Sequence, residues 1–209
     1  MIKRVAFFAG KKDVENYFGI QSKREQMFEA HYNLSIGQQL PAVSMEDDAP
    51  RINHLRWGKG LHDKEQTGSV SIDDVPDVLK SKETGRCVIP ISGFYVWKEK
   101  RESDHPFFVR MLNEPFMSIA AVKYTNEEPY FQFITTSSNA LIQPMSESMP
   151  LMLNKTISHK WLQSVHKTED LLKDAKSLFL LTDLSVLRVN KRVNDPSQND
   201  PALIQPIPK

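Results

Sequence analysis

Few side chains in this sequence could act as a nucleophile or bind a metal ion. The chain has one cysteine, Cys87, which lies in an apolar segment, and a thiol buried in such surroundings is inert. Of the six histidines, His159 and His166 are seven positions apart, which is outside the spacing of zinc-binding histidine pairs. The other four are His31, His54, His62 and His105. We therefore expect no metal site and no cofactor.

A second group of residues forms five segments whose types and order are distinctive. The most specific one is Arg86-Cys87-Val88-Ile89-Pro90, running into Gly93-Phe94-Tyr95-Val96-Trp97-Lys98. The others are Tyr32-Asn33-Leu34 with Gln38, Arg56-Trp57-Gly58, Phe133–Thr136 with Asn139–Leu141 and Met149–Leu153, and Arg192–Pro196 with Asp200–Ile204. In this order, and over nearly the whole chain, they resemble the SRAP (SOS-response-associated peptidase) family of abasic-site-processing proteins.

The resemblance implies a specific chemistry. Members of the family bind single-stranded DNA that contains an abasic site, and they carry a cysteine at position 2 that becomes N-terminal when the initiator methionine is removed. The α-amine and the thiol of that cysteine trap the sugar aldehyde as a thiazolidine. A glutamate, a histidine and an asparagine line the site, where they orient the sugar and move protons.

This sequence departs from the family at each reactive position. Ile2 stands in place of the cysteine, Val96 in place of the glutamate and Ser146 in place of the histidine. Isoleucine at position 2 also prevents removal of Met1. The asparagine belongs to a motif expected in the loop of residues 59–74, where Gln66-Thr67-Gly68 is the nearest candidate. We therefore expect no catalytic residues and no thiazolidine formation.

The resemblance also points to two residues that could bind DNA without chemistry. Arg4 matches an arginine that lies near the phosphates, and Trp57 matches an aromatic residue that stacks beside the lesion. Each has an alternative role, because Arg4 could pair with a carboxylate and Trp57 could belong to the core. The family's second arginine falls at Gly68, and a family proline is replaced by Ile36.

Three hypotheses for function follow. The first is a catalytically inactive SRAP protein of the DNA-damage response that still binds single-stranded DNA. The second is an interaction module in which a cleft made apolar by Ile2, Val96 and Ile36 binds a protein or peptide. The third is a weak lyase, in which the Met1 α-amine, with a pKa of about 8, forms a Schiff base with the abasic aldehyde. A positive groove past Arg4 and Trp57 would favour DNA.

The periodicity of the sequence predicts an α+β domain of residues 1–209 rich in consecutive strands. Such an order favours a mainly antiparallel or mixed sheet, or a barrel, with flanking helices. Expected strands are 3–8, 41–45, 52–57, 86–90, 93–98, 106–111, 118–124, 131–135 and 178–181, with a turn at Asp47–Pro50. Expected helices are 13–18, a short one opened by Pro76, 156–165 and 168–174. Residues 59–74 are expected to form a loop, and the tail from Asn194 an extended strap.

Composition places few limits on function. The chain has 209 residues, 25% of them charged, and a net charge of +1, so any nucleic-acid binding must come from a local patch. No apolar stretch is long enough to span a membrane, and the N-terminal apolar run is too short for a signal peptide. A single cysteine among 209 residues suits a reducing compartment. We therefore expect a cytoplasmic protein without membrane contact, whose protein partners the sequence does not identify.

Overall fold

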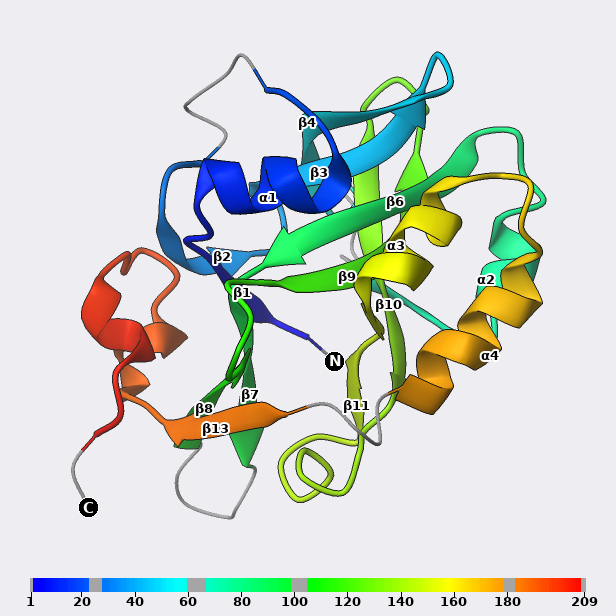
Figure 1. Cartoon of the computed structure of the whole chain (residues 1–209). Coiled ribbons are helices and arrows are strands. Elements are labelled where there is room, and N and C mark those ends of the chain that lie inside the picture. Colours follow the sequence, from blue (N-terminus) through cyan, green and yellow to red (C-terminus); the bar gives the residue numbers. More distant parts are fainter. Residues whose placement is uncertain (1, 23–27, 60–66, 99–104, 179–182, 208–209) are drawn as a thin grey trace.

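A barrel of five strands forms the centre of the protein. The computed structural model describes residues 2–22, 28–59, 67–98, 105–178 and 183–207. The barrel strands are β3 (Gln39–Glu46), β4 (Ala49–Trp57), β6 (Thr84–Ile91), β9 (Met117–Tyr124) and β10 (Tyr130–Ser137). Pairing runs β4-β3-β6-β9-β10 and closes because β10 also pairs with β4, in parallel, while the other pairs are antiparallel. The predicted α+β class with a mixed sheet or barrel is therefore confirmed (Figure 1).

The hairpin between β3 and β4 shows how local sequence sets the register. Asp47 and Asp48 both have positive φ, at 49° and 59°, as a two-residue hairpin turn with the twist of the strands requires. Aspartate tolerates this region better than most residues. Ala49 and Pro50 already belong to β4, so the observed turn is shorter than the predicted one, Asp47–Pro50.

A second sheet of five strands adjoins the barrel where the chain passes from β6 to β7. Its order is β13 (Leu184–Arg188), β8 (His105–Met111), β7 (Gly93–Lys98), β1 (Arg4–Phe7) and β2 (His31–Ser35). Three short strands extend the barrel sheet: β5 (Ser69–Ser71), β11 (Ser148–Pro150) and β12 (Met152–Leu153). β6 and β7 are separated by Ser92 alone, so β7 is held directly at the boundary between the two sheets.

Helices cover the outside of the barrel. They are α1 (Lys11–Phe18), α2 (Val75–Val78), α3 (Lys155–Leu162) and α4 (Thr168–Leu178), and α3 packs against β6. Gly19 ends α1 with a φ of 66°, as glycine readily does after a helix. Asn154 begins α3, since its side chain accepts a hydrogen bond from the backbone N–H of Ile157 at 2.8 Å. None of the described helices is long and apolar enough to cross a membrane.

Three further sequence predictions need correction. α4 continues to Leu178, so the predicted strand 178–181 is wrong at its first residue, and its remaining residues lie outside the described ones. The expected loop 59–74 contains β5, because Ser69–Ser71 pair in parallel with β10. The tail is not simply extended, because it forms the 3₁₀ helices η3 (Lys191–Asn194) and η4 (Pro201–Ile204).

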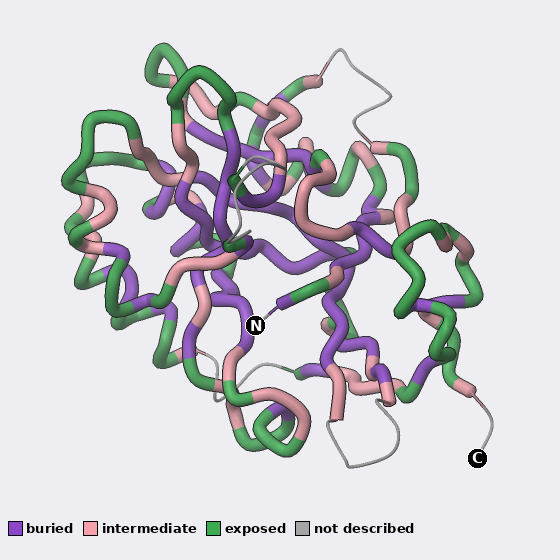
Figure 2. The backbone as a smooth tube through the Cα atoms, turned by 180° about the vertical axis from the view of Figure 1, so that it is seen from behind, coloured by how far each residue is buried: buried purple, intermediate pink, exposed green. Residues whose placement is uncertain are grey.

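Buried residues follow the strands of both sheets, and exposed residues gather in the connections (Figure 2). One apolar cluster includes Val5 of β1 and Val96 of β7 together with the barrel residues Val88 and Phe131. A smaller cluster lies under the tail, where Val193 and Leu203 are fully buried against Tyr95. Because one core joins the two sheets, we infer that residues 1–209 fold as a single domain.

Candidate functional site

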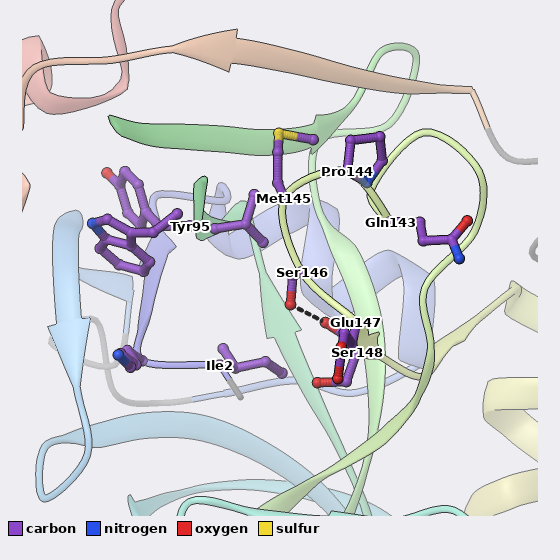
Figure 3. Close-up of a pocket in the computed structure, with 11 residues that line it drawn as sticks. Ile2, Tyr95, Gln143, Pro144, Met145, Ser146, Glu147 and Ser148 are labelled. Carbon is purple, nitrogen blue, oxygen red and sulfur yellow. Dashed lines mark hydrogen bonds between the residues drawn. The ribbon is translucent and has the colours of Figure 1, made fainter. Parts of the chain in front are cut away.

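The three residues that the sequence comparison matched to the family's reactive positions lie around one cavity (Figure 3). Ile2, Val96 and Ser146 come from three separate parts of the chain, and all three line a space of about 540 Å³. The whole lining consists of Ile2, Lys3, Tyr95, Val96, Trp97, Gln143, Pro144, Met145, Ser146, Glu147 and Ser148. Volumes of this size are typical of small-molecule sites.

The boundary between the two sheets brings these residues together. β1 pairs with β7 at Val5 and Phe94, so the residues just before β1 and just after Phe94 lie near each other. The third wall is the loop between β10 and β11, which β11 fixes by pairing with the end of β10. In Figure 3, Ser146 of this loop lies between Ile2 and Met145, and the Met145 side chain points away from Ile2.

The floor of the cavity is apolar and continuous with the core. Ile2 and Val96 are 4% and 5% exposed and belong to the main apolar cluster, against which Met145 also packs. The Ser146 hydroxyl donates a hydrogen bond to the Ser148 carbonyl oxygen at 2.7 Å, within its own loop. None of Ile2, Val96 and Ser146 can transfer a proton near neutral pH, and none carries an amine or thiol that could attack a sugar aldehyde.

Polar side chains make up most of the cavity's rim, and those of Tyr95 and Trp97 are already hydrogen-bonded within the protein. The Tyr95 hydroxyl donates to the Tyr32 carbonyl oxygen at 2.6 Å, and burial raises its pKa. The Trp97 indole N–H donates to Asn194 Oδ1 at 2.8 Å. Charge among the lining residues comes from Lys3 and Glu147, both exposed, so the cavity carries one cation and one anion.

Arg4 lies directly beyond the cavity on β1. Its side chain is partly buried, which lowers its pKa, and its Nη1 donates to the Lys3 carbonyl oxygen at 2.9 Å. Its Nε is buried without a hydrogen-bond partner among the described residues. No described carboxylate forms an ion pair with it. The guanidinium therefore has donor capacity left over, and the structural alternative of a carboxylate partner finds no support in the described part of the chain.

Trp57 lies in the core and not on the surface. The side chain is fully buried, its indole N–H donates to the Gly68 carbonyl oxygen at 2.7 Å, and its ring packs edge-on against Phe133. A Cβ on Gly68 would lie 2.6 Å from the indole nitrogen and 2.8 Å from Ile36, so this contact requires glycine. Stacking on a base needs an exposed ring face, and Trp57 has none here. Ile36 packs on Gly68 and does not line the cavity.

The candidates for the missing asparagine also lie elsewhere. Thr67 accepts two hydrogen bonds from Gln132 Nε2, both at 2.8 Å, and Gln132 is itself held by the Tyr124 hydroxyl at 2.6 Å. Neither Thr67 nor Gly68 lines the cavity. Gln66 and Met1 lie outside the described residues, so the lyase hypothesis based on the Met1 amine is not placed.

The other residues that could act as nucleophiles or metal ligands do not line the cavity. Cys87 is fully buried, and burial raises the pKa of its thiol to about 12. Within the described ranges, no three His, Cys, Asp or Glu residues are grouped so that they could hold a metal ion. Sequence reasoning missed Lys3, Met145 and Glu147 as lining residues. Each directly adjoins Ile2 or Ser146 in the sequence, and this adjacency could have pointed to them.

Comparisons with known proteins agree with this geometry. The family described as "SOS response associated peptidase (SRAP)" matches residues 1–196. The chain is similar to the "Abasic site processing protein YoqW" of Bacillus subtilis (24% identity, covering 98% of this chain and 99% of the relative). It also resembles the "Abasic site processing protein YedK" of Escherichia coli (21% identity, covering 84% of each).

Solved structures show the same fold. A protein from Bacteroides thetaiotaomicron superimposes with a TM-score of 0.78 at 18% identity, covering 98% of this chain and 99% of that one. A phage-related protein from Bordetella bronchiseptica gives a TM-score of 0.71 at 15% identity, covering 90% of this chain and 94% of that one. The match to the family covers most of the chain, and this chain belongs to the SOS response associated peptidase (SRAP) family.

Proposed function

We propose that this chain is a SRAP protein that binds single-stranded DNA without forming a covalent bond to it. One observation supports the loss of chemistry: Ile2, Val96 and Ser146, which the sequence comparison matched to the family's reactive positions, line one cavity. The relatives named as abasic site processing proteins support DNA as the ligand. A cytoplasmic location is part of the same proposal.

The covalent route fails on elementary grounds. A thiazolidine needs an amine and a thiol on one residue, because the amine forms the imine and the sulfur then closes the ring. Ile2 supplies no sulfur, and the apolar Val96 can neither donate nor accept the proton that imine formation requires. The Ser146 hydroxyl is turned toward Ser148. Losing all three functions at one cavity leaves binding as the remaining role.

Non-covalent DNA binding rests on the cations next to the cavity. Lys3 is exposed at its rim, and Arg4, which follows it in the chain, is partly exposed. Two such cations can each contact a phosphate, and each contact makes affinity fall with salt. Trp57 is buried, so we assign it no stacking role, and we expect only weak affinity.

Fluorescence anisotropy with a labelled single-stranded oligonucleotide tests binding. The oligonucleotide is used with and without an abasic site, at about 50 and 200 mM salt. Arg4→Ala is compared with Arg110→Ala, which removes an equally charged but exposed arginine on β8. We expect salt-sensitive binding that Arg4→Ala weakens several-fold and Arg110→Ala leaves nearly unchanged. Absence of binding at low salt, or equal losses in both variants, would contradict the proposal.

A restored variant tests the missing chemistry. Ile2→Cys, Val96→Glu and Ser146→His together return the family's residues to the cavity, and cysteine at position 2 also permits removal of Met1. We expect this triple variant to form a crosslink to abasic DNA that survives denaturing electrophoresis, while the natural chain forms none. The control carries Ser in place of Ile2 with the other two changes, because it exposes an amine without a thiol. A crosslink formed by the natural chain would refute the loss of activity.

A further inference from the structure

One face of the second sheet continues outward from the cavity. Val96 on β7 lies opposite Phe107 on β8, and Phe107 lies opposite Arg188 on β13. Residues that lie opposite each other in an antiparallel pair project their side chains from the same face of the sheet. Val96, Phe107 and Arg188 therefore form one row across three neighbouring strands. Since Val96 lines the cavity and Arg188 is exposed, this row leads from the cavity floor to an exposed cation.

A second row on the same face adds another cation. Lys98 is two residues beyond Val96 on β7, so it projects from the same face about 7 Å further along the strand. It lies opposite His105 of β8, and Arg188 Nη2 lies 3.1 Å from His105 Nδ1. Arg188 and Lys98 are thus the cations on either side of His105. Among the described residues, neither forms an ion pair with a carboxylate.

The described part of this face is free of acidic side chains. Apart from Lys98, His105 and Arg188, the described residues of β7, β8 and β13 that project from it are apolar. The facing wall of the cavity contributes one carboxylate, Glu147, and the cavity rim also carries Lys3, which offsets that charge. The described face and the cavity beside it therefore have a net positive charge, which favours an anionic ligand.

Phe107 adds an aromatic ring between the two cations. Its side chain packs against the main apolar cluster and is partly exposed. Neighbouring strands are about 5 Å apart, so Lys98 and Arg188, which are two strands apart, are separated by about 10 Å across the sheet. Surfaces that bind single-stranded nucleic acid combine cations that follow the phosphates with aromatic rings that contact the bases. This face has both.

We propose that this face of β7, β8 and β13 binds the DNA strand where the strand leaves the cavity. Arg188 and Lys98 each contact a phosphate, and a base lies against Phe107. This inference rests on the proposed DNA binding and assigns it a second contact area. The face also supplies the aromatic contact that the fully buried Trp57 does not.

The salt dependence of binding tests the two phosphate contacts. The probe is a labelled oligothymidine of about 12 nucleotides with one abasic site, and fluorescence anisotropy gives its affinity at several salt concentrations. Arg188→Ala and Lys98→Ala should each weaken binding several-fold. Each should also lower the slope of log affinity against log salt by about 0.7, the value for one phosphate contact on a single strand. Arg110→Ala, which removes an exposed arginine from the opposite face of β8, should change neither quantity.

A conservative variant tests the base contact. Phe107→Leu keeps an apolar side chain against the core but removes the ring. Because the ring contacts no phosphate, this variant should weaken binding about fivefold or more and leave the salt slope unchanged. Unchanged affinity in Phe107→Leu would refute the base contact. If this variant fails to fold, the variants of the exposed cations still decide the inference.

The same titrations separate failure of this inference from failure of the proposed function. Binding that Arg4→Ala weakens but Arg188→Ala and Lys98→Ala leave unchanged would overturn the inference and keep the proposed function. Equal losses in Arg188→Ala and Arg110→Ala would also overturn the inference, because the effect would then follow total charge and not this face. No binding of the natural chain at low salt would overturn both.

Discussion

The burial of Trp57 makes a quantitative prediction for Trp57→Phe. The change removes the indole N–H that donates to the Gly68 carbonyl oxygen at 2.7 Å and trims a fully buried ring that packs against Phe133. The Gly68 oxygen keeps one partner, because it also accepts from the backbone N–H of Phe133 at 3.0 Å. The hydrogen bond is therefore worth about 1 kcal/mol, and the lost apolar volume about 1–2 kcal/mol. We expect the free energy of unfolding to fall by about 2–3 kcal/mol.

Trp97→Phe is the matched control. It also removes an indole N–H, which donates to Asn194 Oδ1 at 2.8 Å, but this bond lies at the surface, where water can replace the partner. We expect a loss below about 1 kcal/mol. Urea denaturation followed by circular dichroism measures both values. A Trp57→Phe loss no larger than that of Trp97→Phe would refute the reasoning, and so would a Trp57→Phe protein that is fully folded yet loses DNA affinity.

Three further predictions test other contacts. The Cys87 thiol, whose pKa burial raises to about 12, should react with a thiol-specific reagent only on unfolding, and reaction at the rate of a free thiol in the native protein would show that it is accessible. Asn154→Ala should lower the free energy of unfolding by about 1 kcal/mol, because it removes the side chain that accepts a hydrogen bond from the Ile157 N–H. Asn154→Asp keeps an acceptor there and should lower it less. Arg86→Ala should lower the free energy of unfolding by about 2–4 kcal/mol, because the guanidinium donates hydrogen bonds to two carbonyl oxygens and a hydroxyl in the segment from α3 to α4. Lys80→Ala removes only an exposed ion pair and should leave the free energy of unfolding almost unchanged.

Local patterns predicted the parts of the fold that depend on neighbouring residues. The two consecutive aspartates gave the turn between β3 and β4, Gly19 marked the end of α1, and Pro76 marked the start of α2. β5 was missed because three residues cannot show a period, and its place is fixed by pairing with β10, far along the chain. The apolar run from Leu178 predicts a strand, although Leu178 is the last residue of α4, because a short apolar run does not distinguish a strand from a buried helix.

The candidate site was harder to predict because its character depends on contacts across the two sheets. Motif positions pointed to Ile2, Val96 and Ser146, and the structure brings all three to one cavity. The same reasoning gave Trp57 a surface role, since a tryptophan at a strand end has no sequence signal for burial. Its burial depends on Gly68, which is 11 positions further along the chain and must lack a side chain for the indole to fit.

The grouping of the replacements at one cavity gives them a common physical reason. A carboxylate at position 96 would lie on a floor formed with Ile2 and Met145, and burying a charge there without a partner costs several kcal/mol. Once Ile2 replaces the thiol, a neighbouring acid has no reaction to serve and only this cost remains. Valine at 96 removes the cost and joins Ile2 in the main core. None of the three positions lies in a barrel strand, so the barrel does not depend on a reactive group at any of them.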